Sequence, residues 1–291
     1  MSTNTTLRLL IPQWQGGMNP NYVLGAQLLA LIAPPSEVDE TITISVPENF
    51  EAPLATKQGI DRFEELMGQT KETLAVLAEK GPDKVIIFGG DCSISQAPFS
   101  YLSEKYGDKL GILWLDAHPD IATPEYSAHL HEMVLGNLIG QGSPEFASQV
   151  TSPVPAHRVM YAGLMKEDLR SGLDDGVWEN QIALATPADL ADSSQPILDW
   201  ITANGIEVLA VHFDLDVLSP QDFRSIYPAE PGTRVEDFPA AVGQLRLADV
   251  VRILSDISGQ ADLVGLSIAE HLPWDAINLR KALSQISIFK E

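Results

Sequence analysis

The sequence has one cysteine, few basic residues and no long apolar run, and each shortage excludes a class of protein. Cys92 alone cannot form a disulfide within the chain. The 291 residues include 18 Lys and Arg against 40 Asp and Glu, a formal net charge of −22. Such a surface repels phosphate backbones, so nucleic acid is not an expected partner. The start, MSTNTTLRLLIPQWQGG, lacks the basic segment and apolar stretch of a signal peptide or membrane anchor. We therefore expect a cytoplasmic protein without a membrane partner, whose acidic surface favours small cations.

Short apolar runs alternate with helical patterns along the whole chain. Seven runs are clear strand candidates and QIALATP is a weaker one; the seven are TLRLLIP, TITISVP, KVIIFGG, LGILWLDAH, RVMYAG, VLAVHFDLD and DLVGLSIAE. Most are continuous rather than alternating, which is typical of parallel strands covered on both faces. We expect one α/β domain over residues 1–291, with three layers around a central, mainly parallel sheet of about eight strands.

Two apolar stripes at helical spacing are expected to face this core. One contains Ile60, Phe63, Met67, Leu74 and Leu77 and ends at Gly81; the other contains Leu247, Val250, Val251, Leu254 and Ile257 and ends at Gly259.

Acidic and imidazole side chains follow two of the predicted strands. Asp116, His118 and Asp120 come after LGILWL, and Asp214 and Asp216 come after VLAVHF. Residues two apart in a strand point to the same side, so each set converges. Carboxylates gathered at one spot repel unless a cation neutralises them, and oxygen with imidazole suits divalent ions such as Mn. Aspartates after strands also commonly cap the next helix. Two such patterns at two strand ends favour the metal site, with room for two ions sharing a water.

Four motifs in order resemble those of the ureohydrolase superfamily, the arginase and agmatinase family. They read GGDCS at 89–93, DAHPD at 116–120, HFDLD at 212–216 and GLSIAE at 265–270. The resemblance implies a three-layer α/β fold and a binuclear Mn site that hydrolyses a guanidinium or related amidino C–N bond. It also implies a homo-oligomer, either a trimer or a hexamer.

The resemblance further implies a role for each metal-site residue. Asp116 and Asp214 match carboxylates that bridge the two ions. His118 and Asp216 match ligands of one ion, and Asp120 matches a ligand of the other.

Two further residues match catalytic positions of the family. Glu270 matches the acid that pairs with the substrate guanidinium, a task suited to a planar, bidentate acceptor. His131, in SAHLHEM, matches a histidine that passes a proton to the leaving amine. The alternative for His131 is an ordinary surface histidine at a helix start.

Three departures from the family pattern bear on the metal and the substrate. Cys92 stands where the family has a histidine ligand. His212 stands where it has a serine, on the ligand side of its strand, which is consistent with a residue that supports the ligands from behind. Ala122 replaces an asparagine that binds the amino-acid end of arginine. Cys92 is either a small buried side chain or a thiol facing the ions, and a thiolate there would favour Zn, Ni or Co over Mn.

The departures leave two interpretations of function. The first is a hydrolase of a guanidino or amidino compound other than L-arginine. The second is a non-catalytic metal-binding relative on the same scaffold. Retention of both His131 and Glu270 favours the enzyme.

Overall fold

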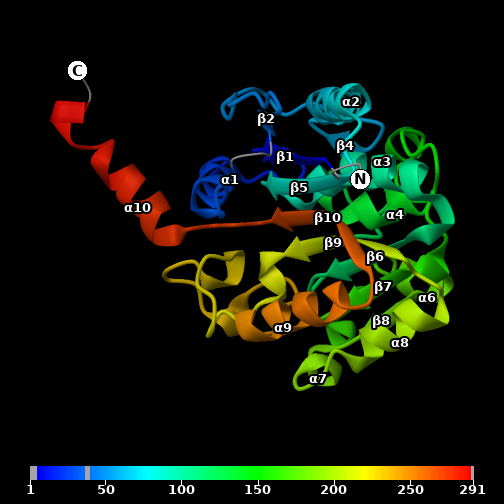
Figure 1. Cartoon of the computed structure of the whole chain (residues 1–291). Coiled ribbons are helices and arrows are strands. Elements are labelled where there is room, and N and C mark those ends of the chain that lie inside the picture. Colours follow the sequence, from blue (N-terminus) through cyan, green and yellow to red (C-terminus); the bar gives the residue numbers. More distant parts are fainter. Residues whose placement is uncertain (1–4, 37–39, 290–291) are drawn as a thin grey trace.

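The computed structural model describes residues 5–36 and 40–289, and eight parallel strands form one sheet within them (Figure 1). Across the sheet these are β2 (Glu40–Thr43), β1 (Thr6–Ile11), β5 (Lys84–Gly89), β10 (Asp262–Ala269), β9 (Val208–Asp214), β6 (Leu110–Leu115), β7 (Val159–Ala162) and β8 (Ala183–Ala185). Each neighbouring pair runs parallel. The predicted fold class is confirmed, and every predicted strand contributes to this sheet.

Helices cover both faces of the sheet because both faces are apolar. Along β6, Ile112 and Trp114 belong to one buried cluster, and the intervening Leu113 and the next Leu115 belong to the other. The first cluster includes side chains of α2 (Phe63–Lys80), α3 (Gln96–Tyr106) and α4 (Val134–Leu138). The second includes side chains of α8 (Gln195–Ala203) and α9 (Leu247–Ser258). The chain is thus three-layered, with the sheet in the middle.

Further helices and one short strand pair complete the described chain. They are α1 (Asn21–Ile32), α5 (Pro144–Ala147), α6 (Gly176–Glu179), α7 (Pro187–Leu190), α10 (Trp274–Leu283) and an antiparallel pair, β3 (Thr56–Lys57) with β4 (Ile60–Asp61).

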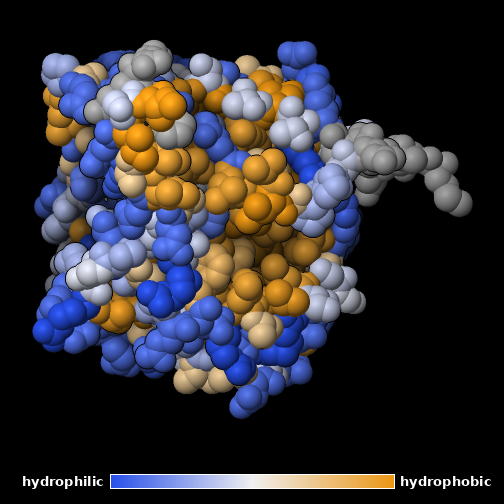
Figure 2. Space-filling view, turned by 90° about the vertical axis from the view of Figure 1, so that its left-hand side faces the viewer, coloured by the Kyte–Doolittle hydropathy of each residue, from blue (hydrophilic) through white to orange (hydrophobic). Residues whose placement is uncertain are grey.

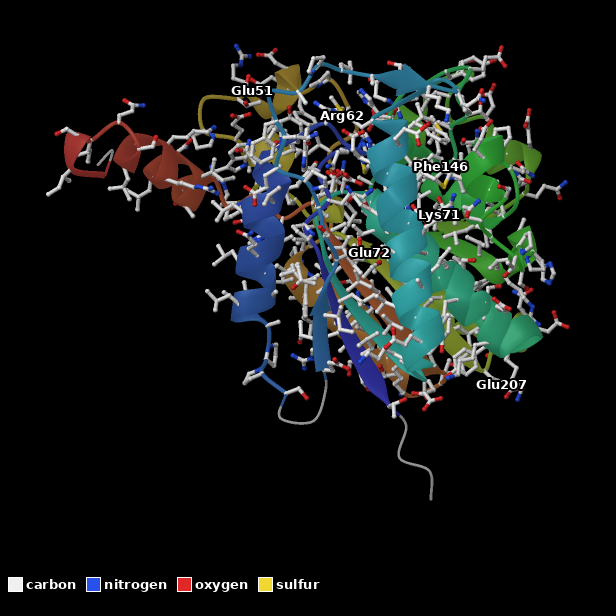
Figure 3. The ribbon with its side chains drawn as sticks, turned by 90° about the horizontal axis from the view of Figure 1, so that it is seen from above. Glu51, Arg62, Lys71, Glu72, Phe146 and Glu207 are labelled. Carbon is white, nitrogen blue, oxygen red and sulfur yellow. The ribbon has the colours of Figure 1, made fainter. Side chains whose placement is uncertain are left out.

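Both predicted helical stripes lie in helices, with two differences. Helix α2 ends at Gly81, whose φ of 60° suits glycine, but Ile60 lies in β4 before the helix. Figure 3 shows α2 along the sheet, with its exposed Lys71 and Glu72 labelled. In α9 the expected core residues Leu247 and Val251 are 41% and 61% exposed. The stripe is wider than the face that meets the sheet, so Val250 and Ile257 are buried and these two are not.

Helix α10 leaves the body of the molecule (Figure 1). Trp274 and Ile277 anchor its start in a cluster with Trp14 and Tyr22. Beyond that anchor the exposed apolar side chains are Leu279, Leu283, Ile286 and Ile288. Figure 2, which looks onto the side from which α10 projects, shows apolar residues gathered around a hollow. Within the described residues, no helix is long and apolar enough to cross a membrane.

The strand order brings the sequence motifs together. The four central strands are β5, β10, β9 and β6, and one of the four motifs lies at or just beyond the carboxyl end of each. Because parallel strands share one carboxyl edge, these motifs meet at that edge, where α/β sheets commonly bind ligands.

Candidate active site

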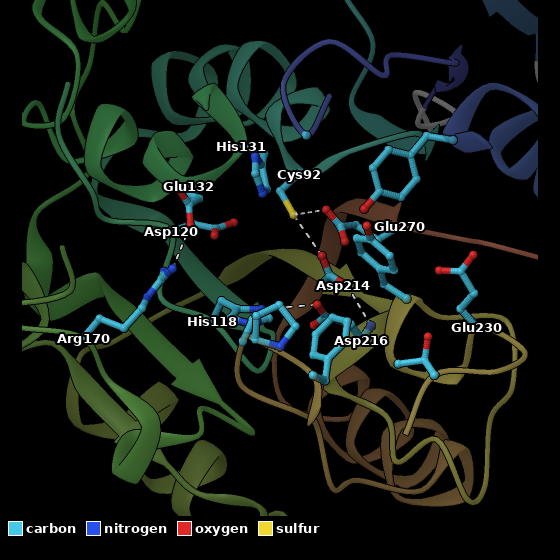
Figure 4. A pocket seen from close by; sticks show the side chains of 17 residues that line it. Cys92, His118, Asp120, His131, Glu132, Arg170, Asp214, Asp216, Glu230 and Glu270 are labelled. Carbon is cyan, nitrogen blue, oxygen red and sulfur yellow. Dashed lines mark hydrogen bonds and ion pairs between the residues drawn. The ribbon is translucent and has the colours of Figure 1, made fainter. Parts of the chain in front are cut away.

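A cavity of about 360 Å³ opens at the carboxyl edge of the central strands (Figure 4). Seven of the eight predicted site residues line it: Cys92, His118, Asp120, His131, Asp214, Asp216 and Glu270. The eighth, Asp116, is fully buried and lies within metal-ligand distance of several of them. The structure therefore brings together all the residues that the motifs indicated.

The aspartates after β6 and β9 shape the backbone and still converge. Asp116 Oδ1 accepts a bond from the His118 N–H at 2.7 Å, and Asp214 Oδ1 accepts one from the Asp216 N–H at 2.7 Å. These bonds bend the chain as it leaves each strand. Asp214 is also the cap of a short 3₁₀ turn, so the capping alternative holds in part. The second oxygens also accept hydrogen bonds, Asp116 Oδ2 from the Trp114 indole N–H at 3.1 Å and Asp214 Oδ2 from the Cys92 thiol at 2.8 Å.

Three groups of side chains could each hold an ion. Ligand atoms within each group lie within 4.8 Å of one another; the groups are Cys92–Asp116–Asp120–His212, Cys92–Asp214–Glu270 and Asp116–His118–Asp216. Asp116 belongs to two groups, as a bridging carboxylate would. The expected bridging role of Asp214 stays a prediction, because Asp214 groups only with Cys92 and Glu270.

Four buried polar atoms of this region have no hydrogen-bond partner among the described residues. They are His118 Nε2, Asp120 Oδ2, His212 Nε2 and Asp216 Oδ1. Buried polar groups are nearly always paired, and four orphans at one place indicate a missing common partner. A divalent cation matches two carboxylate oxygens and two imidazole nitrogens, so the residues present fit a metal.

Burial and mutual repulsion raise the pKa of four carboxyl groups of the site, whereas, although burial opposes this, His118 lowers that of Asp216. Burial, with the charge of Asp216 adding to it, raises the pKa of Glu270 to about 7 and, with the same neighbour, that of Asp116 to about 6. Burial also raises the pKa of Asp120 and Asp214 well above the usual range. Burial lowers the pKa of His212 to about 3, so its ring is neutral.

Two of the site residues adopt strained backbone conformations. Asp120 has φ of 46° and Glu270 has φ of 62°, in the left-handed region that side chains disfavour. The Glu270 N–H donates to the carbonyl of Gly90 at 2.7 Å, and its carboxyl bonds to Tyr22. Such strain persists only where surrounding contacts enforce it and clusters at functional sites.

His131 is held with one nitrogen toward the cavity. Its Nδ1 bonds to the Gly16 carbonyl at 2.8 Å, and the Gly16 and Gly17 N–H groups donate to buried Asp91 at 2.9 and 3.1 Å. The aspartate of GGDCS therefore positions the loop that orients His131. The neighbouring His129 does not line the cavity; its Nε2 lies 4.0 Å from Asp61.

Cys92 is both buried and turned toward the acids. Its Sγ lies 2.8 Å from Asp214 Oδ2 and 3.6 Å from Glu270 Oε1, so the thiol donates to Asp214. Burial, reinforced by the charge of Asp214, raises the pKa of this thiol well above its usual value. Cys92 is thus both a small buried side chain and a thiol that faces the acids of the cavity.

Several cavity residues were not predicted. Tyr22 comes from α1, and Arg170 pairs with Glu132 at 3.0 Å and with Asp174 at 3.2 Å. The segment 227–240 adds Glu230 and an apolar wall, and its position directly after the HFDLD strand was the available signal. Ala122 packs in an apolar cluster with Met133 and does not line the cavity.

Comparisons of the sequence and the fold with known proteins find similarity to arginases. A model of the arginase family matches residues 36–280. Arginase 2, chloroplastic/mitochondrial, of Arabidopsis thaliana is 28% identical over 220 residues, covering 75% of this chain and 55% of that protein. The chain thus spans about half the length of such curated relatives.

Solved structures show the same fold. Entamoeba histolytica arginase in complex with L-ornithine has 20% identity and a TM-score of 0.77, covering 94% of this chain and 93% of that one. Formimidoylglutamase of Bacillus subtilis has 14% identity and a TM-score of 0.64, covering 94% and 81%.

Proposed function

This chain belongs to the arginase family, and from that membership we propose that it is a metal-dependent hydrolase of a guanidino or related amidino C–N bond. The observation that carries the proposal is one cavity lined by the acid and imidazole cluster and by Glu270 and His131 together. A metal-binding protein without catalysis would not need His131, which belongs to none of the three candidate metal groups. The strained backbone of Glu270 adds support, because such strain clusters at functional sites.

The acids and imidazole at the floor of the cavity would hold two divalent ions. Asp116, His118 and Asp216 would hold one, while Asp120, with Asp116 and Asp214 between the two sites, would hold the other. Bound divalent ions supply Lewis-acid activation of water near neutral pH. Mn is the ion that the resemblance implies, and Zn, Ni or Co are the alternatives that Cys92 introduces.

The chain's own residues would orient the substrate and move protons. The Glu270 carboxylate, fixed by the Tyr22 hydroxyl and by its bond to Gly90, would accept two N–H groups of a planar cation. His131, whose Nδ1 is held by Gly16, would donate a proton from Nε2 to the departing nitrogen. Cation binding would also keep Glu270 ionised, because it opposes the neighbouring negative charge.

The wall of the cavity favours a substrate without an amino-acid carboxylate. Of the described lining residues, Arg170 alone carries a guanidinium or ammonium group, and Glu132 and Asp174 already pair with it. Glu230 would repel a carboxylate, and Phe238 and Pro239 offer it only an apolar surface. We therefore propose a small cationic guanidino or amidino compound other than L-arginine.

We also propose an assembly and a location. The apolar residues on and after α10 suit a contact between copies of the chain, which fits the expected trimer or hexamer. A cytoplasmic location fits a sequence whose one cysteine cannot form a disulfide within the chain.

A substrate screen tests the function. Purified protein loaded separately with Mn, Ni, Zn or Co would be incubated with guanidino and formimino compounds, and release of urea, ammonia or formamide would be measured. We expect turnover with at least one cationic compound, and its loss in Glu270→Gln. No turnover with any ion and compound, in protein shown to contain two ions, would contradict the proposal.

A further inference from the structure

His212 is a buried histidine next to the acids of the cavity, and it has no role in the chemistry proposed above. It is fully buried in β9, and its ring stacks on Trp114 of β6 with centroids 3.8 Å apart. Its backbone lies opposite Trp114 on one side and Ser267 of β10 on the other. The ring therefore has little freedom to turn, and where its nitrogens point is fixed by the fold.

Two serines hold one side of the ring. Nδ1 lies 2.8 Å from Ser95 Oγ and 3.1 Å from Ser267 Oγ, and the Ser95 hydroxyl donates to Ser267 at 2.7 Å. With its proton given to Ser267, the Ser95 oxygen can accept a proton from Nδ1. In the tautomer with the proton on Nδ1, Nε2 carries a lone pair that a metal can take. This is how supporting hydrogen bonds commonly prepare an imidazole to bind a metal.

The other nitrogen faces the acids and has no partner among the described residues. Nε2 is buried and lies 3.8 Å from Asp116 Oδ2, beyond hydrogen-bonding distance. Asp120 Oδ2, in the same group, is also buried and unpartnered. A histidine serving only to pack the core would have both nitrogens satisfied.

The four side chains lie close enough together to converge on one ion. Ligand atoms of Cys92, Asp116, Asp120 and His212 all lie within 4.8 Å of one another. Four tetrahedral ligands about 2.0–2.3 Å from an ion are about 3.3–3.8 Å apart, so the side chains would draw together when an ion binds. The imidazole missing from the GGDCS motif after β5 is supplied from β9, with β10 lying between these two strands in the sheet.

We infer that His212 is a direct ligand of the ion that Asp120 would hold. It would replace the imidazole that the family has at the position of Cys92. The site would then consist of one thiolate (Cys92), one imidazole (His212) and two carboxylates (Asp116 and Asp120). This rests on the proposed function only in taking the cavity as a metal site, and not on any substrate. Since thiolate and imidazole together suit Zn, Co and Ni better than Mn, this site should prefer the softer ions. The neighbouring group of Asp116, His118 and Asp216 has no sulfur and keeps the preference for harder ions.

Metal binding itself tests the inference, without any substrate. X-ray absorption of the full chain loaded with two Zn per chain should show two imidazoles per two ions, where His118 alone would give one. Loading with Co should produce a sulfur-to-cobalt charge-transfer band in the near ultraviolet. Both readings use the wild-type protein, so they hold even if a variant fails to fold.

The informative variant is His212→Asn, whose amide can still bond to the two serines but does not reach the Nε2 position. Loss of a residue that only hydrogen-bonds to a metal ligand lowers metal affinity by roughly 10–100-fold. If His212 is a direct ligand, the variant should lose more than this in its affinity for Zn or Co at one site. His157→Asn, at an exposed histidine, is the matched control and should bind both ions normally. The double change Cys92→His with His212→Ser should abolish the charge-transfer band and restore binding of two Mn.

Unchanged affinity in His212→Asn, or one imidazole per two Zn in the wild type, would overturn the assignment of His212. The two proposals can also fail separately. If X-ray absorption shows two imidazoles and cobalt gives the charge-transfer band, but the substrate screen finds no turnover, the proposed function is wrong and the metal site is supported.

Discussion

The raised pKa of Glu270 indicates how strongly this cavity disfavours negative charge, and its effect on stability can be measured. In the metal-free protein its carboxyl is buried beside other acids, and burial with the charge of Asp216 raises its pKa from 4.5 to about 7. The folded state therefore holds a proton that the unfolded chain releases near pH 4.5. As pH rises from about 4.5 to about 7, the folded state loses stability relative to the unfolded state.

The change Glu270→Gln isolates this effect, since a glutamine resembles the protonated acid and never ionises. At pH 5 we expect the wild type and the variant to unfold with similar free energies. By pH 8 the variant should be the more stable by on the order of 3 kcal/mol, the energy equivalent of the shift from 4.5 to about 7. Buried His212 also titrates, but it is present in both proteins and cancels in the comparison.

The assay is urea unfolding with a chelator present, at intervals from pH 5 to pH 8, followed by the same series with saturating Zn or Mn. Bound cations offset the crowded charge, so the difference between the two proteins should shrink when metal is added. A difference that stays the same from pH 5 to pH 8 would refute the reasoning, because it would place Glu270 outside the acidic cluster in solution.

Three other outcomes are expected. In metal-loaded protein, Glu270→Gln should lower kcat/KM by roughly 30–1000-fold, from about 2–4 kcal/mol of lost binding to a cation, while metal content measured by mass spectrometry stays at the wild-type level. L-arginine should be turned over with kcat/KM at least about 10-fold below that of the best guanidino compound without a carboxylate, and a finding that arginine is best would contradict this. Gly25→Ala should destabilise the chain by more than about 2 kcal/mol in thermal unfolding, because the added Cβ would lie 1.7 Å from the His271 carbonyl oxygen. Gly68→Ala, in α2 where the new Cβ meets nothing within 4 Å, is the matched control and should stabilise by about 0.5–1 kcal/mol.

The sheet could be predicted because its strands are buried on both faces, which leaves continuous apolar runs such as LGILWL. The pair β3 and β4 has two residues per strand, too few to produce a pattern. The convergence of Asp116 with His118, and of Asp214 with Asp216, followed from their spacing and the shared carboxyl edge of the strands.

Other parts of the site depend on contacts between distant segments. Tyr22 and Arg170 reach the cavity from α1 and from a loop, and nothing in their neighbouring residues marks them as site residues. The spacing also put His212 on the ligand side of β9. Only its three-dimensional surroundings reveal that Nδ1 is satisfied and Nε2 is not.

The order of the four central strands has a consequence for how the protein folds. The candidate ligands come from the ends of β5, β6, β9 and β10, between residues 92 and 270, so no short stretch of chain contains a complete site. Pairings between such distant segments form late and slowly, after long loops have closed. An ion that needs all of them cannot guide the early steps, and it should leave the folding rate almost unchanged. It should instead slow unfolding, since its contacts are absent from the transition state and must be broken to reach it.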